Sequence, residues 1–292
     1  MELCESSVRG LAAIPAYSFR GRGGCANVRS CYRVDRRLMP LRETEAIVLR
    51  TYRLGEADKI ISLFSRQFGR IRAAATGAQR PKSRFGGLLE PLSYIRLWLF
   101  ERENRELFRV NSAELLESFF GMQRDYHVQL AAQYMSEAAE RLLPEREVNE
   151  RAFRLYLAVL RGLKTTSEID RPLAYFDYWL LRLGGFLPPL GQCIVCGKHL
   201  AGEVIYYGQN AVGFTCGVCR RLENRSRVPS ESLALLEQIS KSPLERWLTS
   251  ESQTPLAGDV RRPLEAWVEF SAEKKLLTLE MLSAHGQPTE LR

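Results

Sequence analysis

The sequence predicts an α+β protein in which a small N-terminal barrel of five strands precedes a helical region that holds a four-cysteine metal site. Three observations carry this prediction. Short β-branched runs fill the first third of the chain, helical spacing of apolar residues follows, and two Cys-x-x-Cys pairs stand nineteen residues apart further on. With 292 residues, 45% of them hydrophobic, the chain is long enough for two or three domains with cores of their own.

Five strand signals lie close together in the N-terminal part. They cover residues 46–50, 59–64, 71–75, 94–100 and 107–110, and 107–110 is a weaker signal than 94–100. Phe68-Gly69-Arg70 is typical of a hairpin turn, and a loop rich in Gly, Pro and basic residues spans 77–87. Five short strands within about seventy residues indicate a small closed barrel, and the OB-fold is the commonest five-stranded choice. We therefore expect an OB-fold domain over residues 41–118.

Helical spacing replaces the strand pattern after Gly121. The predicted helices cover 128–143, 153–163, 172–183, 229–239 and 263–282. Pro144 ends the first of them, and Gly184-Gly185 is a plausible stop for the third. We expect one helical domain over residues 119–292, with a zinc module inside it at 187–227.

Residues 1–40 differ in composition from the rest of the chain. They contain three cysteines, seven arginines, a glycine cluster and little hydrophobic periodicity. Three interpretations compete: a disordered basic arm, an Arg-rich targeting peptide, or a mis-assigned start with translation beginning at Met39. The third is favoured because well-patterned sequence begins directly after Met39. Cys4, Cys25 and Cys31 have no metal-ligand spacing and receive no role.

The most specific chemical signal is the pair of motifs Cys193-x-x-Cys196 and Cys216-x-x-Cys219. Two such pairs match the spacing of a site in which four thiolates bind one structural zinc ion. Gly197 and Gly217 provide the turns that let both sulfurs of a pair reach one ion. Two disulfides or four free thiols are the alternatives. They are less favoured because no secretory signal is visible and the pairs recur symmetrically.

Positive charge is concentrated in the predicted barrel. Between Arg50 and Arg84, nine Lys and Arg residues face two acidic ones, a local net charge of +7 within a chain of +8. Such a surface favours binding of a polyanion, although a scattered solvated face is the simpler alternative. The candidate nucleic-acid contacts are Arg50, Arg53, Lys59, Arg70, Arg72, Arg80, Lys82 and Arg84, with Tyr52 and Phe85 as candidates for stacking on bases.

No catalytic motif is recognisable. The three histidines, His127, His199 and His285, lie outside any nucleophile or metalloprotease pattern, and no phosphate-binding loop is present. His199 could replace a thiolate as a metal ligand, but four cysteines already complete a closed shell. No run of eighteen apolar residues exists, so no membrane-spanning helix is predicted. We expect a protein that is not an enzyme.

The ordered motifs resemble those of the bacterial RecO family of DNA repair and recombination mediators. The resemblance runs from about Thr44 to about Asn224, and more weakly to the C-terminus. It rests on Ala46-Ile-Val-Leu-Arg50, on Gly77-Ala-Gln-Arg80-Pro-Lys-Ser-Arg84-Phe, on Phe176-Asp-Tyr-Trp-Leu-Leu181 and on the two cysteine pairs. The apolar run Leu276-Leu-Thr278-Leu departs from the family pattern, so no C-terminal binding residue is carried over.

The resemblance implies a non-catalytic, cytoplasmic, nucleoid-associated mediator. Such a protein binds single- and double-stranded DNA, anneals complementary strands and helps to load the RecA recombinase. Its implied partners are RecR and the acidic C-terminal tail of single-stranded-DNA-binding protein, with the RecA filament contacted indirectly. Two other hypotheses remain: a zinc-ribbon adaptor for RNA or protein in a transcription or translation complex, and a zinc-dependent enzyme.

Overall fold

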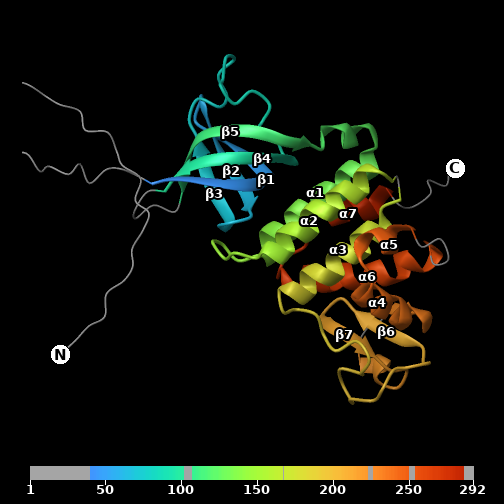
Figure 1. Ribbon diagram of the computed structural model, residues 1–292. Coiled ribbons are helices and arrows are strands. Elements are labelled where there is room, and N and C mark those ends of the chain that lie inside the picture. Colours follow the sequence, from blue (N-terminus) through green and yellow to red (C-terminus); the bar gives the residue numbers. More distant parts are fainter. Residues whose placement is uncertain (1–39, 102–106, 167, 223–225, 250–253, 286–292) are drawn as a thin grey trace, which may run out of the picture. The chain divides into compact units, whose positions relative to one another are not determined.

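The computed structural model describes residues 40–101, 107–166, 168–222, 226–249 and 254–285. The helices and strands of the described residues lie within the compact unit Met39–Arg292, and they run from the blue barrel strands to the red C-terminal helices in Figure 1. The predictions about residues 1–38, including those about Cys4, Cys25 and Cys31, fall outside the described residues.

Five N-terminal strands close into a barrel in the order β1-β2-β3-β5-β4. Their bounds are β1 Leu41–Leu54, β2 Asp58–Ser65, β3 Gly69–Ala75, β4 Ser93–Phe100 and β5 Phe108–Ser118. All neighbours are antiparallel except β3 and β5, which pair in parallel over two residues. This is an OB-fold barrel, so the predicted α+β class with an N-terminal OB-fold is confirmed.

The strands keep the period of two that was expected. On β3, Ile71, Ala73 and Ala75 are buried in the barrel, whereas Arg70 and Arg72 point outward. β1 and β5 are longer than predicted because the residues added at their ends are mostly exposed or half-buried and do not alternate between buried and exposed positions.

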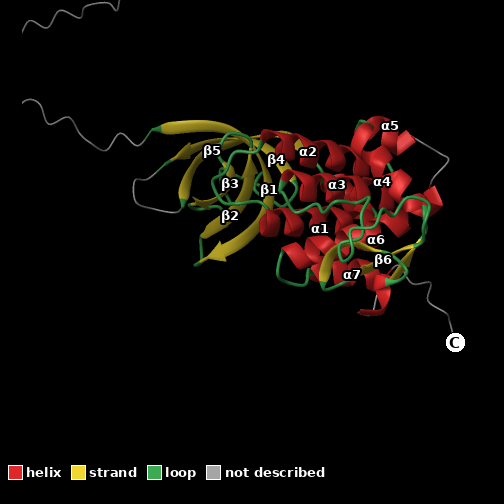
Figure 2. Cartoon of the chain, turned by 90° about the horizontal axis from the view of Figure 1, so that it is seen from below, coloured by secondary structure: helices red, strands yellow, loops and turns green. Residues whose placement is uncertain are grey.

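The C-terminal part is mainly helical, as Figure 2 shows. Its helices are α1 Tyr126–Leu142, α2 Glu150–Lys164, α3 Asp170–Leu183, α4 Glu231–Lys241, α5 Leu244–Thr249, α6 Thr254–Ser271 and α7 Leu277–His285, with short 3-10 turns at Phe120–Arg124 and Cys219–Leu222. Side chains cap the first two helices: Asp125 accepts from the backbone of His127 and Val128, and Asn149 accepts from Ala152. α3 ends before Gly184-Gly185, as predicted.

The prediction of one helix over 263–282 is wrong. The segment contains the end of α6 and most of α7, with a break after Ser271. Glu273 adopts a left-handed φ of 51° at the break, and the Glu269 carboxylate accepts the backbone N–H of Leu276. Apolar residues keep helical spacing across the break, which concealed it. The short helix α5 and the strands β6 Ile205–Gly208, β7 Ala211–Thr215 and β8 Ser226–Val228 were not predicted.

One outer face of the barrel is part of the helical core. Ile47, Leu49, Phe64 and Tyr94 point away from the barrel interior and belong to the same buried cluster as the helical residues. The ring of Phe153 lies 5.6 Å from that of Phe64 and 6.3 Å from that of Tyr94. Phe64 and Tyr94 are therefore core residues shared by the barrel and α2.

None of the helices in the described ranges is long and apolar enough to cross a membrane.

We predict that Phe153→Ala lowers the free energy of unfolding by roughly 3–5 kcal/mol, because it opens a cavity between the barrel and α2. Urea denaturation measures the loss. Arg151→Ala, a change at an exposed position of the same helix, should stay within about 0.5 kcal/mol of the parent. Equal stability of the two variants would show that Phe153 does not hold the barrel on the helices.

Candidate metal centre and nucleic-acid interface

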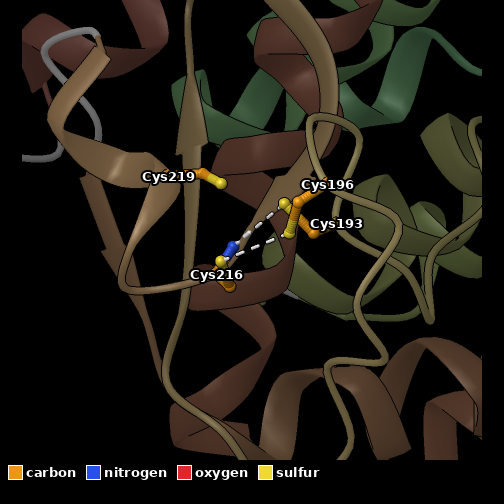
Figure 3. Close-up of side chains that lie close together, drawn as sticks. All are labelled: Cys193, Cys196, Cys216 and Cys219. Carbon is orange, nitrogen blue, oxygen red and sulfur yellow. Dashed lines mark hydrogen bonds between the residues drawn. The ribbon is translucent and has the colours of Figure 1, made fainter.

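The four cysteines converge from two loops of the small module between α3 and α4. Cys193 and Cys196 precede β6, Cys216 directly follows β7, and Cys219 begins a 3-10 turn. Figure 3 shows their side chains grouped together, and the four sulfur atoms all lie within 4.8 Å of one another. The predicted set of cysteines is thus brought to one place. His199 is exposed and is not part of the cluster.

Backbone hydrogen bonds shape both cysteine loops in the same way. In the first loop, the N–H of Gly197 donates to the carbonyl of Cys193 at 2.8 Å, and the N–H of Cys193 donates to Lys198 at 2.8 Å. Gly197 has a φ of 72°, which confirms the predicted glycine turn. In the second loop, the N–H of Arg220 donates to the carbonyl of Cys216 at 3.1 Å.

The module rests on α6 through strand β7. Phe214 is fully buried, and its ring lies 4.9 Å from that of Trp267 on α6. Its carbonyl also accepts the backbone N–H of Ile194 at 3.0 Å, which ties the first cysteine loop to β7. At Gly213, φ is 125° and a Cβ atom would collide with the Ile194 side chain, so only glycine fits there.

The sulfur atoms have the spacing that a tetrahedral metal needs. The Sγ atoms of Cys196 and Cys216 are 3.8 Å apart, and metal–sulfur bonds of about 2.3 Å give a tetrahedron edge of about 3.8 Å. All four cysteines are free, and this separation is far beyond the roughly 2.05 Å of a disulfide bond. The four thiolates could therefore hold one metal ion.

The surroundings of the cysteines shift their thiol pKa values in opposite directions. Burial opposes ionisation of Cys193, but donated hydrogen bonds, led by the backbone of Cys196 and Cys216, lower its thiol pKa to about 6. Burial and then the neighbouring sulfurs, Cys216 first, raise the pKa of the Cys219 thiol to about 12. The cluster therefore ionises readily once but resists full ionisation, unless a cation offsets the accumulated negative charge.

The candidate basic residues fall into two groups. Four of them form ion pairs, and two of these, Arg70 and Arg72, share the Glu145 carboxylate at 2.9 and 3.6 Å. Arg70 also donates to the carbonyl of Leu143 at 2.9 Å, and Lys59 pairs with Glu90 at 2.8 Å.

Arg50 belongs to the paired group and links the barrel to two helices. It pairs with Glu140 at 3.2 Å and with Glu137 at 3.6 Å, both on α1. The Glu137 side chain is 7% exposed and accepts hydrogen bonds from the backbone and hydroxyl of Thr278, in the first turn of α7. Despite burial, these donors and Arg50 lower the pKa of the Glu137 carboxyl. The sequence pattern does not predict that Glu137 and Glu140 pair with Arg50, because these residues are far apart in the chain.

The second group is exposed. Arg53, Arg80 and Lys82 lie on the surface and form no ion pair with any described residue. Arg84 is also exposed, and its guanidinium lies 4.8 Å from the centre of the Phe85 ring. Backbone bonds from Gln79 to Ala57 and from Gly77 to the Asp58 side chain hold this loop beside the β1–β2 turn. Arg53 on β1 is paired in register with Lys59 just after that turn.

The two stacking candidates differ. Tyr52 is 46% exposed on β1, whereas Phe85 is 1% exposed and fills the barrel core. The prediction that Phe85 stacks on a base is wrong, because the loop folds this side chain inward.

The chain thus belongs to the class of proteins that combine an N-terminal OB-fold with a helical domain, and this helical domain carries a four-cysteine cluster that could bind a metal ion. Two family models match most of this chain: "Recombination protein O N terminal" over residues 39–119 and "Recombination protein O C terminal" over residues 123–280. The chain belongs to the RecO family.

Relatives of similar length support this assignment. The protein named DNA repair protein RecO from Koribacter versatilis is 39% identical over 242 residues, which cover 83% of this chain and 98% of the relative. The protein of that name from Bifidobacterium adolescentis is 30% identical over 250 residues, covering 84% of this chain and all of the relative.

We predict that Gly213→Ala lowers the free energy of unfolding by roughly 1–3 kcal/mol, because a side chain there meets Ile194 and disfavours the backbone conformation. Gly191→Ala is the matched control in the same module, since no atom lies within 4 Å of its added Cβ. Chemical denaturation compares the two, and equal losses would contradict the proposed packing of β7 on the first cysteine loop.

Proposed function

We propose that this protein is a non-catalytic mediator of DNA repair by recombination. It binds single- and double-stranded DNA, anneals complementary strands and assists loading of the RecA recombinase. Proposed partners are RecR and the acidic C-terminal tail of single-stranded-DNA-binding protein, in the bacterial cytoplasm at the nucleoid. The observation that carries the proposal is a group of exposed, unpaired basic side chains on an OB-fold barrel in a chain of the RecO family.

The eight basic residues take two roles in this proposal. Arg53, Arg80, Lys82 and Arg84 are free to meet phosphates directly, because no carboxylate neutralises them among the described residues. Arg50, Lys59, Arg70 and Arg72 must exchange a carboxylate for a phosphate, so their contribution to affinity is smaller. Such contacts are made to the phosphate backbone of DNA and not to its bases, so they give little sequence preference.

The four cysteines bind one structural zinc ion in this proposal. Four thiolates complete a tetrahedral shell, which leaves no position for water or substrate. The ion holds the two cysteine loops together, and the contact of Phe214 on β7 with Trp267 on α6 fixes the module on the helical domain. Residues 41–118 then act as the DNA-binding domain, and residues 119–292 carry the zinc module at 187–227.

We predict that the triple variant Arg80→Gln, Lys82→Gln, Arg84→Gln flattens the salt dependence of single-strand binding. Each lost phosphate contact lowers the log–log slope by about 0.7, so the slope should fall by roughly 2. Fluorescence anisotropy with a labelled oligonucleotide between low and moderate salt measures it.

The matched control removes the same charge elsewhere. Arg227, Lys274 and Lys275 are exposed and lie outside the barrel, so their replacement by Gln should leave the slope close to the parent value. A parent protein that binds DNA but fails to accelerate annealing of complementary strands would favour the zinc-ribbon adaptor instead.

We predict about one zinc ion per chain by elemental analysis of freshly purified protein, and loss of the metal in the double variant Cys193→Ser, Cys216→Ser. Both sulfurs are buried, so their replacement should also lower the unfolding temperature. His199→Ala should retain the metal, because that side chain lies outside the cluster. A zinc content below about half an equivalent in the parent would contradict the proposal.

A further inference from the structure

Helix α2 presents a narrow basic stripe to solvent. Eight of its fifteen residues are buried, and its exposed side chains are Glu150, Arg151, Arg154, Arg161 and Lys164. Four basic residues against one acid give the helix a net charge of +3. The basic positions recur at intervals of three, seven and three residues, so they follow one side of the helix.

The helix crosses the outer face of the barrel and is fixed at both ends. Near its first turn, Arg66 pairs with Glu150 at 3.4 Å, and near its last turn Glu117 accepts from Arg161 at 2.9 Å and Lys164 at 3.3 Å. Between these ends, Phe153 packs on the barrel rings of Phe64 and Tyr94.

The barrel residues that α2 contacts, Phe64, Tyr94 and Glu117, lie on β2, β4 and β5. In register, Phe64 pairs with Ile47 of β1, Ile47 pairs with Tyr94, and Tyr94 pairs with Glu117, so these residues follow one line across the barrel. Figure 2 shows α1, α2 and α3 side by side next to the barrel. The buried side of α2 therefore packs on the barrel. Arg151 and Arg154 point to solvent, whereas Arg161 and Lys164 lie at the end of α2 beside Glu117 of β5.

The positive charge of the stripe is only partly neutralised. Arg151 and Arg154 are exposed and form no ion pair with any described residue. Arg161 and Lys164 share a single carboxylate, so two positive charges face one negative charge. Two unpaired guanidiniums one turn apart are well suited to bind anionic oxygens.

The shape of the stripe favours a nucleic-acid backbone over an acidic peptide. Arg151 and Arg161 are ten residues apart, about 15 Å along the helix, which spans roughly four nucleotides of one duplex strand. Between the basic residues, the partly exposed side chains are those of Leu155 and Ala158. These two apolar side chains provide little apolar surface for the side chains of a bound peptide. The two clefts near the cysteine module are lined by other elements.

We propose that the stripe Arg151, Arg154, Arg161 and Lys164 is a second phosphate-binding surface for DNA, separate from the basic loop of the barrel. The inference rests on the proposed DNA-binding function and extends it to the helical domain. A molecule with two such surfaces holds two stretches of DNA backbone at once, which brings complementary strands together during annealing.

The test compares the parent protein with the double variant Arg151→Gln, Arg154→Gln. Each phosphate contact contributes about fivefold to single-strand affinity at 0.1 M salt, so losing both should weaken binding roughly 20-fold and lower the log–log slope by about 1.4. The annealing rate should fall further when the barrel variant Arg80→Gln, Lys82→Gln, Arg84→Gln is combined with it. Both arginines lack partners, so the unfolding temperature should not change.

The control variant Arg227→Gln, Lys274→Gln removes the same charge from exposed positions outside α2 and should bind DNA like the parent. Parent-like affinity and slope in the α2 variant, with DNA-binding parent protein, would overturn the stripe and leave the proposed function intact. Loss of binding to a labelled poly-glutamate peptide, with DNA binding unchanged, would also overturn it, in favour of a protein partner. A parent protein that binds no DNA would instead refute the proposed function itself.

Discussion

The rest of the structure depends on the apolar seam between the outside of the barrel and the helices. An OB-fold barrel of this size has a small interior, filled mostly by Ile, Leu, Val, Ala and Phe side chains. Its outer residues Ile47, Leu49, Phe64 and Tyr94 add a second core that it shares with α1 and α2. Burying them removes apolar surface from water on both partners, so barrel and helices stabilise each other.

The seam also decides which basic surfaces remain exposed for the proposed DNA binding. The β1, β2 and β4 face is covered, and ion pairs to Glu137, Glu140 and Glu145 around it occupy Arg50, Arg70 and Arg72. Among the residues proposed to bind DNA, those that remain free are Arg53 on β1, the basic residues of the loop after β3, and Arg151 and Arg154 on the solvent side of α2. Charge density along the sequence therefore overstates the role of some strand arginines, because it does not distinguish a phosphate-binding arginine from one that is paired across the seam.

The sequence predicted most of the architecture because the decisive patterns are local. Period-two runs identified the barrel strands, and the cysteine spacing identified all four clustered sulfurs. Three features depended on contacts between distant residues and were missed: the break after Ser271, the inward turn of Phe85 and the partners of Arg50. Arg151 and Arg154 were also overlooked, since the segment around them is electrically neutral and only folding separates their charges from the acids.

Glu137 connects parts of the chain that are far apart in sequence. One buried carboxylate binds Arg50 of the first strand and also anchors the N-terminus of the last helix through Thr278. Removing α7 by proteolysis or by a stop codon before Leu277 would leave this carboxylate with Arg50 and without its hydroxyl and amide donors. The effect would not be confined to the C-terminus, because the Arg50–Glu137 contact between the barrel and α1 would weaken as well. A C-terminal truncation in this protein is thus also expected to disturb the barrel, its proposed DNA-binding end.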